Sequence, residues 1–294
     1  MIASMPHSLP QKVLVLGVTG MLGNAVFRLF SQSPGFETHG TARSAVALRH
    51  FDETLRPRIV VGVDVEQHDH LIELFSRIRP HVVINCIGLV KQLAEADDPL
   101  AALPINALLP HRLARLSLLA GARLVHVSTD CVFTGRRGLY QESDAPDALD
   151  LYGRSKLLGE VDEPHAVTLR TSIIGHELSS AHSLVGWFLA QEGRVRGFTR
   201  AVFSGLPTVE LAKVIRDQVL PRPELRGLWH VSSDPISKFD LLQLVKTAYG
   251  KSIEITPDEA LVIDRSLDSS RFRTETGWAP APWVELVDAM RRFG

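Results

Sequence analysis

The chain has 294 residues, 45% of them hydrophobic, and a formal net charge of −1, which fits an ordinary globular protein of one large or two modest domains and gives no reason to expect a nucleic-acid partner. No apolar run is long enough to cross a membrane, and Met1–Gln11 lacks the apolar core and basic cluster of a signal peptide. Two cysteines cannot form a disulfide framework and the twelve histidines show no metal-ligand spacing, so we expect a protein of the reducing cytoplasm without a metal.

The first predicted elements form a dinucleotide-binding unit. Lys12–Leu16 is a short apolar run typical of a buried parallel strand, and Asn24–Phe30 has helical periodicity. Between them the chain reads G-x-x-G-x-x-G. Gly17 permits a tight turn, Gly20 lets the backbone approach a pyrophosphate at the helix N-terminus, and Gly23 lets the helix lie close to the strand. The alternative is a flexible strand–helix connection without a ligand.

The end of the second predicted strand indicates which dinucleotide is bound. NAD-binding proteins carry an acidic residue there for the ribose 2′-hydroxyl. This strand ends without an acid, and Glu37 lies at its far end. Arg43 offers a planar fork for phosphate oxygens, and Thr41 and Ser44 offer hydroxyl donors. We therefore expect NADP(H), with NAD(H) as the alternative; Arg43 as a solvated loop residue is the competing interpretation.

Strands and helices then alternate along the chain. Further strands are predicted at residues 37–42, 58–63, 81–86, 124–128 and 167–171, and helices at 71–79, 105–120 and 152–160. This order predicts an α/β fold with a doubly wound, parallel Rossmann sheet, with ligands beyond the carboxyl ends of the strands.

The pattern changes after the sixth strand, where prolines are frequent. Helices are predicted at residues 183–191, 209–219, 238–249 and 283–293, and short strands at 228–231 and 252–255. We expect residues 1–171 to form the NADP-binding Rossmann domain, with 1–11 as an N-terminal tail. Residues 172–294 should form a smaller substrate-binding lobe, some of whose elements return to the Rossmann core, and the cleft between the two is the expected substrate site.

The helix predicted at 152–160 carries Tyr152 and Lys156, which lie four residues apart and so point the same way. A cation beside a phenol lowers its pKa, and a proton donor tuned toward neutral pH is what carbonyl reduction needs. The competing interpretation is a surface tyrosine near a surface lysine.

Three segments in this region carry a family resemblance. Residues 128–135 read S-T-D-C-V-F-T-G, residues 140–146 read Y-Q-E-S-D-A-P, and residues 152–160 read Y-G-R-S-K-L-L-G-E. They resemble the S-T-D-Y-V-F-x-G, Y-x-E-x-D-x-P and Y-G-x-S-K-x-x-G-E motifs of the dTDP-4-dehydrorhamnose reductase group of extended short-chain dehydrogenases/reductases. The resemblance runs from Lys12 to about Gly294.

The resemblance implies an NADPH-dependent reductase of a nucleotide-linked 4-keto-6-deoxy sugar, acting in polysaccharide precursor synthesis. Thr129 would bind the substrate carbonyl, Tyr152 would donate the proton, and Lys156 would lower the tyrosine pKa and bind the nicotinamide ribose. The partner would be the nucleotide sugar, and a homodimer is a candidate assembly.

The glycine turn, the ends of the predicted strands and the family resemblance together indicate the residues of the candidate site. The expected cofactor-binding residues are Gly17, Thr19, Gly20, Met21, Leu22, Gly23, Arg43, Ser44, Asp64, Val65, Asn85, Cys86, Ile87, Gly88 and Lys156. The expected substrate-binding residues are Lys91, Thr129, Asp130, Cys131, Tyr152, Arg170, Thr208 and Arg265. Surface ion pairing for the two arginines and helix capping for Thr208 remain the competing interpretations.

Two departures from the group leave the sugar open. Cys131 stands where the group has a tyrosine, which either reshapes the substrate pocket or leaves a free thiol without a role. The turn at residues 88–92 also differs from the reductase version.

Three other functions occur in proteins with related motifs. Sugar-nucleotide dehydratases carry T-D-E in the active strand, and Cys131 cannot replace that glutamate, so a dehydratase is disfavoured. A 4-epimerase uses the same Thr, Tyr and Lys. A relative of the group serves as a non-catalytic regulatory subunit of methionine adenosyltransferase, and an intact triad does not exclude such a role.

Overall fold

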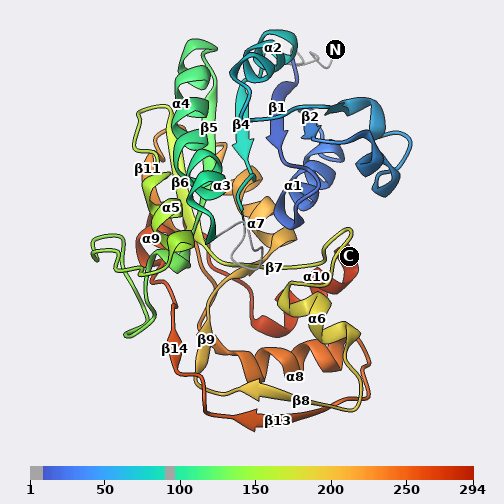
Figure 1. Cartoon of the computed structure of the whole chain (residues 1–294), viewed down its shortest axis with the longest axis vertical. Coiled ribbons are helices and arrows are strands. Elements are labelled where there is room, and N and C mark those ends of the chain that lie inside the picture. Colours follow the sequence, from blue (N-terminus) through green and yellow to red (C-terminus); the bar gives the residue numbers. More distant parts are fainter. Residues whose placement is uncertain (1–8, 90–96) are drawn as a thin grey trace, which may run out of the picture.

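The computed structural model describes residues 9–89 and 97–294. Its main feature is a seven-stranded parallel sheet (Figure 1) with the order β11-β6-β5-β4-β1-β2-β3. The strands are β1 (Gln11–Leu16), β2 (Phe36–Ala42), β3 (Ile59–Val61), β4 (Val82–Asn85), β5 (Arg123–Thr129), β6 (Ala166–Thr171) and β11 (Gly227–His230). The predicted doubly wound Rossmann fold is confirmed.

Helices cover both faces of the sheet. One face carries α1 (Met21–Ser31), α7 (Thr208–Val214) and α9 (Ser270–Thr276), and the other carries α2 (His68–Ile78) and α4 (Leu109–Leu119). Strand β1 shows the reason: Val13 and Val15 belong to the first core, whereas Leu14 and Leu16 belong to the second. A strand that is apolar at every position must be covered on both sides.

Short segments complete this part of the chain. They are the 3₁₀ segments η1 (Ala45–His50), η2 (Arg56–Arg58) and η5 (Asp130–Val132), the helices α3 (Pro99–Ala102) and α5 (Leu151–Leu158), and the π-helical segments η4 (Leu103–Leu108) and η6 (Ile215–Val219). The helix predicted at 105–120 therefore begins earlier, at Pro99, and contains a π-helical segment that periodicity did not reveal. The helix predicted at 209–219 likewise ends in such a segment.

A second, smaller group of elements has its own core. It contains α6 (Leu184–Ala190), α8 (Lys238–Ala248), α10 (Trp283–Phe293), β8 (Arg194–Phe198), β9 (Ala201–Phe203), β12 (Ile236–Ser237), β13 (Glu254–Asp258) and β14 (Ile263–Asp264). The short strands β7 (Ile173–Ile174) and β10 (Leu206–Pro207) pair with each other. Because α7, β11 and α9 return to the large sheet and α10 contributes to both cores, the chain crosses between the groups repeatedly. The division at residue 171 stays a prediction.

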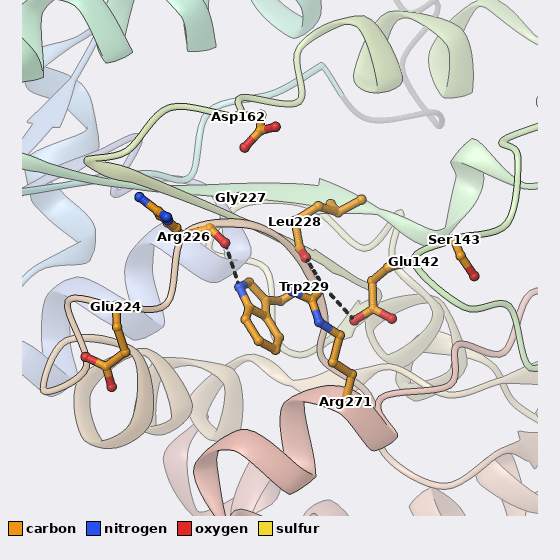
Figure 2. A pocket seen from close by; sticks show the side chains of 9 residues that line it. All are labelled: Glu142, Ser143, Asp162, Glu224, Arg226, Gly227, Leu228, Trp229 and Arg271. Carbon is orange, nitrogen blue, oxygen red and sulfur yellow. Dashed lines mark hydrogen bonds and ion pairs between the residues drawn. The ribbon is translucent and has the colours of Figure 1, made fainter.

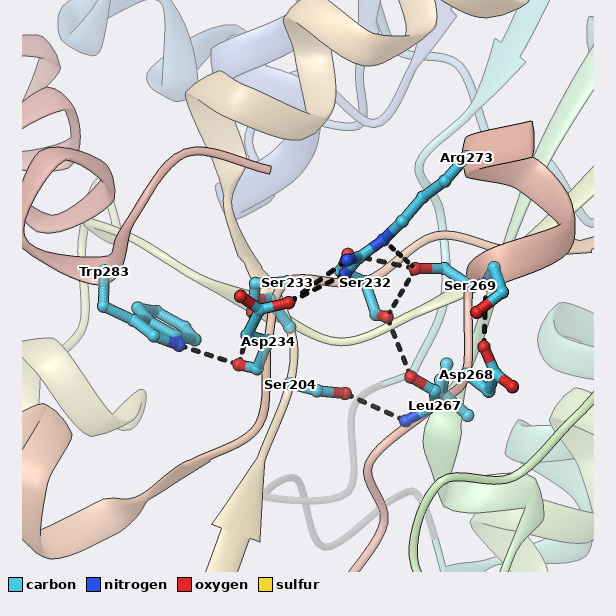
Figure 3. A network of polar contacts seen from close by, with 11 residues as sticks. Ser204, Ser232, Ser233, Asp234, Leu267, Asp268, Ser269, Arg273 and Trp283 are labelled. Carbon is cyan, nitrogen blue, oxygen red and sulfur yellow. Dashed lines mark hydrogen bonds and ion pairs between the residues drawn. The ribbon is translucent and has the colours of Figure 1, made fainter. Parts of the chain in front are cut away.

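A network of polar contacts joins the two groups (Figure 3). Ser204, after β9, accepts a hydrogen bond from the backbone N of Leu267 at 3.0 Å, and Ser232, after β11, donates one to the Leu267 carbonyl at 2.9 Å. The hydroxyl of Ser232 also lies 3.0 Å from that of Ser269. The segment that carries Arg265 is thus held between the ends of two strands.

Close packing at the first strand–helix junction depends on glycine. Gly17 has a φ of +82°, and a Cβ at Gly23 would lie 2.1 Å from the Gly17 carbonyl oxygen. A Cβ at Gly20 would lie 3.4 Å from the same oxygen, near ordinary contact distance. The two glycines of the predicted turn therefore differ in how strictly they are required.

We predict that Gly23→Ala lowers the free energy of unfolding by about 1–3 kcal/mol, because the methyl group forces the backbone apart. Gly20→Ala is the matched control and should change it by roughly 0.5 kcal/mol or less. Urea unfolding without added ligand measures both. Equal losses in the two variants would contradict the close approach at Gly23.

Candidate functional site

The sheet order places a crevice between β1 and β4. The chain leaves β1 toward β2 and β3, whereas from β4 it proceeds in the opposite direction, and ligands of doubly wound folds bind where the order reverses. The loops after these strands touch, since a Cβ at Gly17 would lie 2.7 Å from Ile87 Cγ1. Thr19 and Gly20 are exposed in this region and Met21 is half-buried. The glycine loop and the turn at residues 85–88 thus line one crevice.

An exposed arginine without a partner among the described residues lies at the end of β2. Arg43 is exposed and has no hydrogen-bond or ion-pair partner within residues 9–89 and 97–294. Ser44 is exposed and accepts a hydrogen bond from Val46 N at 3.2 Å, which starts η1. Thr41 does not fit the expectation of a ligand contact: it is buried and its Oγ1 accepts a hydrogen bond from Gly17 N at 3.2 Å. It fixes the glycine loop instead.

Some of the predicted cofactor-binding residues are buried in the cores or hydrogen-bonded within the protein. Leu22 and Val65 are buried in the two cores, so their side chains support the loops from below. Asn85 is buried; its Oδ1 accepts from Ile87 N at 3.1 Å and its amide nitrogen lies 3.1 Å from His126 Nδ1. Asp64 accepts from Glu66 N at 3.0 Å, an Asx turn after β3.

Helix α5 begins directly against the end of β5. Asp150 caps it by accepting a hydrogen bond from Gly153 N at 2.8 Å. A Cβ at Gly153 would lie 2.3 Å from the carbonyl oxygen of Cys131. This approach brings the Tyr152 phenol close enough to the Thr129 hydroxyl for Thr129 to lower its pKa. The sequence-predicted Thr129 and Tyr152 therefore meet.

Lys156 lies one helical turn farther along α5 and is 5% exposed. Its Nζ donates to the Val127 carbonyl at 2.9 Å, and a Cβ at Gly88 would lie 3.7 Å from it. Burial lowers the pKa of Lys156 from 10.5 to about 8, while the carboxylate of Glu160 acts in the opposite direction. The ammonium thus faces the turn after β4, the other wall of the crevice.

The protonation of Tyr152 differs from the sequence-based expectation. Burial raises the pKa of Tyr152, Cys131 and Asp130 raise it further when they are ionised, and the nearby Thr129 hydroxyl lowers it. Lys156 is not among the groups that shift it most. The expected lowering is therefore wrong for the protein without ligand, because desolvation is the largest cause and raises the pKa of Tyr152.

A charged cluster adjoins this pair. Asp130 is buried, which raises its pKa, and Arg265 opposes that shift. Arg265 Nε donates to the Phe133 carbonyl at 2.8 Å, and its Nη1 lies 3.7 Å from Cys131 Sγ. Burial raises the pKa of Cys131 to about 12, so the thiol is neutral. Cys86, half-buried after β4, also has a pKa raised by burial to about 12.

Three predicted substrate residues lie elsewhere or outside the described chain. Arg170 is 3% exposed and its guanidinium pairs with Glu160 inside the protein, so its expected contact with a sugar nucleotide is wrong. Thr208 does not cap α7, whose N-cap is Pro207; it is buried against Gly175. Lys91 lies outside the described residues.

Asn106 was missed by sequence reasoning. It lies in η4, accepts a hydrogen bond from Leu89 N at 2.9 Å and donates to Ser155 Oγ at 3.2 Å. A Cβ at Gly159 would lie 2.0 Å from its carbonyl oxygen. It thereby joins the turn after β4 to α5. A π-helical segment, a frequent mark of functional sites, is the signal that could have identified it.

A surface hollow lies at a different place. It has a volume of about 600 Å³ beside the edge strand β11 and is lined by Glu142, Trp229 and Arg271 among others (Figure 2). Arg271 donates to the Leu228 carbonyl at 2.9 Å and lies 3.7 Å from the centre of the Trp229 ring. These contacts cover the exposed edge of the sheet. None of the candidate residues lines this hollow.

Neither a metal-binding cluster nor a membrane-spanning helix is found among the described residues. The described residues contain no group of three or more His, Cys, Asp or Glu side chains that could hold a metal ion. Within the same residues, every helix is too short or too polar to span a bilayer.

Comparison with known proteins gives one family match. The model of the family described as "RmlD substrate binding domain" matches residues 11–263. Methionine adenosyltransferase 2 subunit beta of Xenopus laevis is 31% identical over 307 aligned residues, covering 96% of this chain and 81% of that protein. The protein of the same name from Danio rerio is 28% identical over 253 residues, covering 81% of this chain and 74% of its own.

The fold also matches solved structures. The dTDP-4-dehydrorhamnose reductase of Bacillus anthracis, crystallised with NADP, superposes with a TM-score of 0.77 over 97% of this chain and 100% of that chain. The two are 21% identical, so this likeness shows the fold alone.

The depressed pKa of Lys156 makes stability depend on pH. Below about pH 8 the folded protein carries the full cost of a buried ammonium. As the pH rises toward 10.5, the folded protein loses this proton before the unfolded chain does, so burial costs progressively less. Relative to Lys156→Met, the wild-type free energy of unfolding should rise by up to about 3 kcal/mol over this window. Urea unfolding between pH 7 and 10 measures it, and a flat difference would contradict the assignment.

Proposed function

Because the chain belongs to the RmlD substrate binding domain family, we propose that it is an NADPH-dependent reductase of a nucleotide-linked 4-keto-6-deoxy sugar, serving polysaccharide precursor synthesis. One observation carries the proposal: the hydroxyls of Thr129 and Tyr152 lie next to each other at the carboxyl end of β5, with Lys156 one turn away facing Gly88. A hydroxyl pair beside a cation, at the edge of a dinucleotide crevice, suits reduction of a carbonyl.

The residues around the crevice fit NADPH. Gly17 and Gly23 leave no room for side chains at the junction between β1 and α1, which lets the N-terminus of α1 lie close to the strand ends, where a pyrophosphate can bind. Arg43 is exposed, without a partner in the described chain, at the end of β2. We assign it to the 2′-phosphate, which it can hold with two parallel hydrogen bonds.

The chemistry requires a hydride, which NADPH supplies when bound, and a proton, which this chain supplies. Tyr152 donates the proton to the carbonyl oxygen as hydride reaches the carbon, leaving an alcohol. Thr129, which already contacts the phenol, donates a hydrogen bond to the same oxygen. Lys156 stabilises the phenolate that remains and holds the nicotinamide ribose.

The raised pKa of Tyr152 is compatible with this role. In the absence of ligand the phenol keeps its proton, so the donor is loaded before substrate arrives. Asp130 and Arg265 lie on the other side of Thr129 and, with Cys131, are assigned to the sugar. Cys131 leaves more room than the tyrosine of the reductase group, so the sugar identity stays open.

A second candidate function follows from the relatives. The two proteins named methionine adenosyltransferase 2 subunit beta align with most of this chain, which supports a non-catalytic NADP-binding subunit. A 4-epimerase is the third possibility, because it needs the same three side chains.

Cofactor absorbance separates these functions. The protein is mixed with NADPH and dTDP-4-keto-6-deoxyglucose or its 3,5-epimer, and absorbance at the nicotinamide band is followed while sugars are separated by chromatography. A reductase oxidises one NADPH for each alcohol formed. An epimerase changes the sugar without net oxidation, and a regulatory subunit binds NADPH and changes neither.

Tyr152→Phe should reduce the turnover number by about a hundredfold to ten-thousandfold, because the ring stays and only the acidic proton is lost. NADPH binding, measured by fluorescence, should be nearly unchanged. Comparable turnover by the two proteins would remove Tyr152 from the mechanism.

Arg43→Ala should weaken NADPH use by roughly tenfold or more, since one charge-assisted contact is worth about 1.5–3 kcal/mol. NADH use should hardly change, because NADH lacks the 2′-phosphate. The measurement is kcat/KM with each cofactor, and Arg49→Ala, an exposed arginine on η1, is the matched control. Equal losses with both cofactors would mean that Arg43 does not touch the phosphate.

A further inference from the structure

A buried ion pair lies behind the candidate site. Arg170 donates to Glu160 through Nε and Nη2, both at 2.7 Å. The side chains are 3% and 12% exposed. A buried ion pair adds little net stability compared with apolar residues of the same shape. Its presence beside α5 therefore calls for a role other than stability.

Three neighbouring strands hold this pair. Ser128 of β5 stands opposite Arg170 of β6, which stands opposite His230 of β11. Ser128 Oγ donates to Glu160 Oε1 at 2.7 Å, and Arg170 Nη1 lies 3.3 Å from His230 Nε2. We call Ser128, Arg170 and His230 the polar row.

The histidine of the polar row is neutral. Burial lowers the pKa of His230, and its Nδ1 lies 2.9 Å from the Tyr140 carbonyl oxygen. Nδ1 therefore carries the proton and donates it to that carbonyl, which leaves Nε2 to accept from Arg170. Arg170 also lies over the Phe133 ring, 5.3 Å from its centre. The guanidinium is thus fixed on several sides and cannot turn toward a substrate.

The polar row acts on Lys156 through Glu160. Glu160 lies four residues beyond Lys156, just past the end of α5, and its negative charge favours the ammonium. Lys156 itself binds the carbonyl of Val127, the residue before Ser128. The other titratable groups that face Lys156 are neutral: the pKa of Cys86, after β4, is raised by burial, and that of His126 in β5 is lowered by burial. Glu160, although paired with Arg170, is thus the carboxylate that favours the buried ammonium.

We propose that Glu160 is a positioning residue for Lys156 in the reaction proposed above: the polar row fixes its carboxylate, which seats the end of α5 against β5, where Lys156 Nζ binds the Val127 carbonyl. The neighbouring glycine supports this geometry. Gly159 lies against the Asn106 carbonyl, so the helix end that carries Glu160 has little freedom to move. The inference rests on the proposed function for its purpose, but the Glu160–Lys156 coupling is measurable without it.

The test measures the pKa of Lys156 directly. Competitive labelling with acetic anhydride over a range of pH, read by peptide mass spectrometry, gives this value without cofactor or substrate. In Glu160→Gln the apparent pKa of Lys156 should fall by about one unit or more, because an opposite charge nearby is lost. Ser128→Ala is the matched control: it removes one hydrogen bond to Glu160 but keeps the charge and both contacts with Arg170, so the value should change much less than in Glu160→Gln.

A second variant keeps the proposal testable if Glu160→Gln is too unstable to fold. Glu160→Gln leaves Arg170 buried without its carboxylate, which is destabilising. The double variant Glu160→Gln with Arg170→Met removes both charges, and it should show a Lys156 pKa below that of the wild type. An unchanged Lys156 pKa in a folded variant that lacks Glu160 would overturn the proposal.

Measurements of turnover distinguish a failure of the Glu160 proposal from a failure of the proposed reductase function. With NADPH and the keto sugar, the alkaline limb of the pH profile of kcat/KM should move to lower pH in Glu160→Gln. A shifted Lys156 pKa without reductase activity in any protein would leave the Glu160–Lys156 coupling in place and reject the reductase. A shifted pKa with an active enzyme whose pH profile does not move would reject the positioning role.

Discussion

The structure depends most on the close approach of α5 to the carboxyl end of β5. Only a residue without Cβ can stand at Gly153, where the Cys131 carbonyl oxygen is 2.3 Å from the position of a Cβ, and Gly159 meets the same limit against Asn106. These contacts fix both ends of one short helix. The proximity of Thr129 and Tyr152 and the position of Lys156 follow from them.

Charge placement around this helix follows a common rule: each buried charged group has a defined partner. Arg170 is paired with Glu160, Asp130 is opposed by Arg265, and Lys156 faces the turn after β4. Arg43 differs, because it is exposed and free of partners within the described residues. An exposed, unpaired cation at the entrance to a dinucleotide site can bind a phosphate. The buried charged groups already interact with other groups of the protein.

Family membership narrows the function without fixing it. Enzymes and a subunit of another enzyme share this fold and similar sequences, and the fold supports both. Two local features bear on the choice: Cys131 lies beside Arg265, and the Tyr152 phenol holds its proton without ligand. The proposed reductase would use both, as parts of its substrate pocket and as its proton donor.

The sequence by itself determined the elements governed by local pattern: the apolar strand Lys12–Leu16, the glycines after it, and the spacing of Tyr152 and Lys156. It did not reveal the short strands β7 to β10, β12 and β14, which have few residues and are stabilised by distant neighbours. Only the tertiary structure decided that Arg170 turns inward to Glu160, that Thr41 binds Gly17, and that burial raises the pKa of Tyr152. The reason is physical: periodicity and turn chemistry act over neighbouring residues, whereas the partner of a side chain and its exposure to water depend on residues brought together from distant parts of the chain.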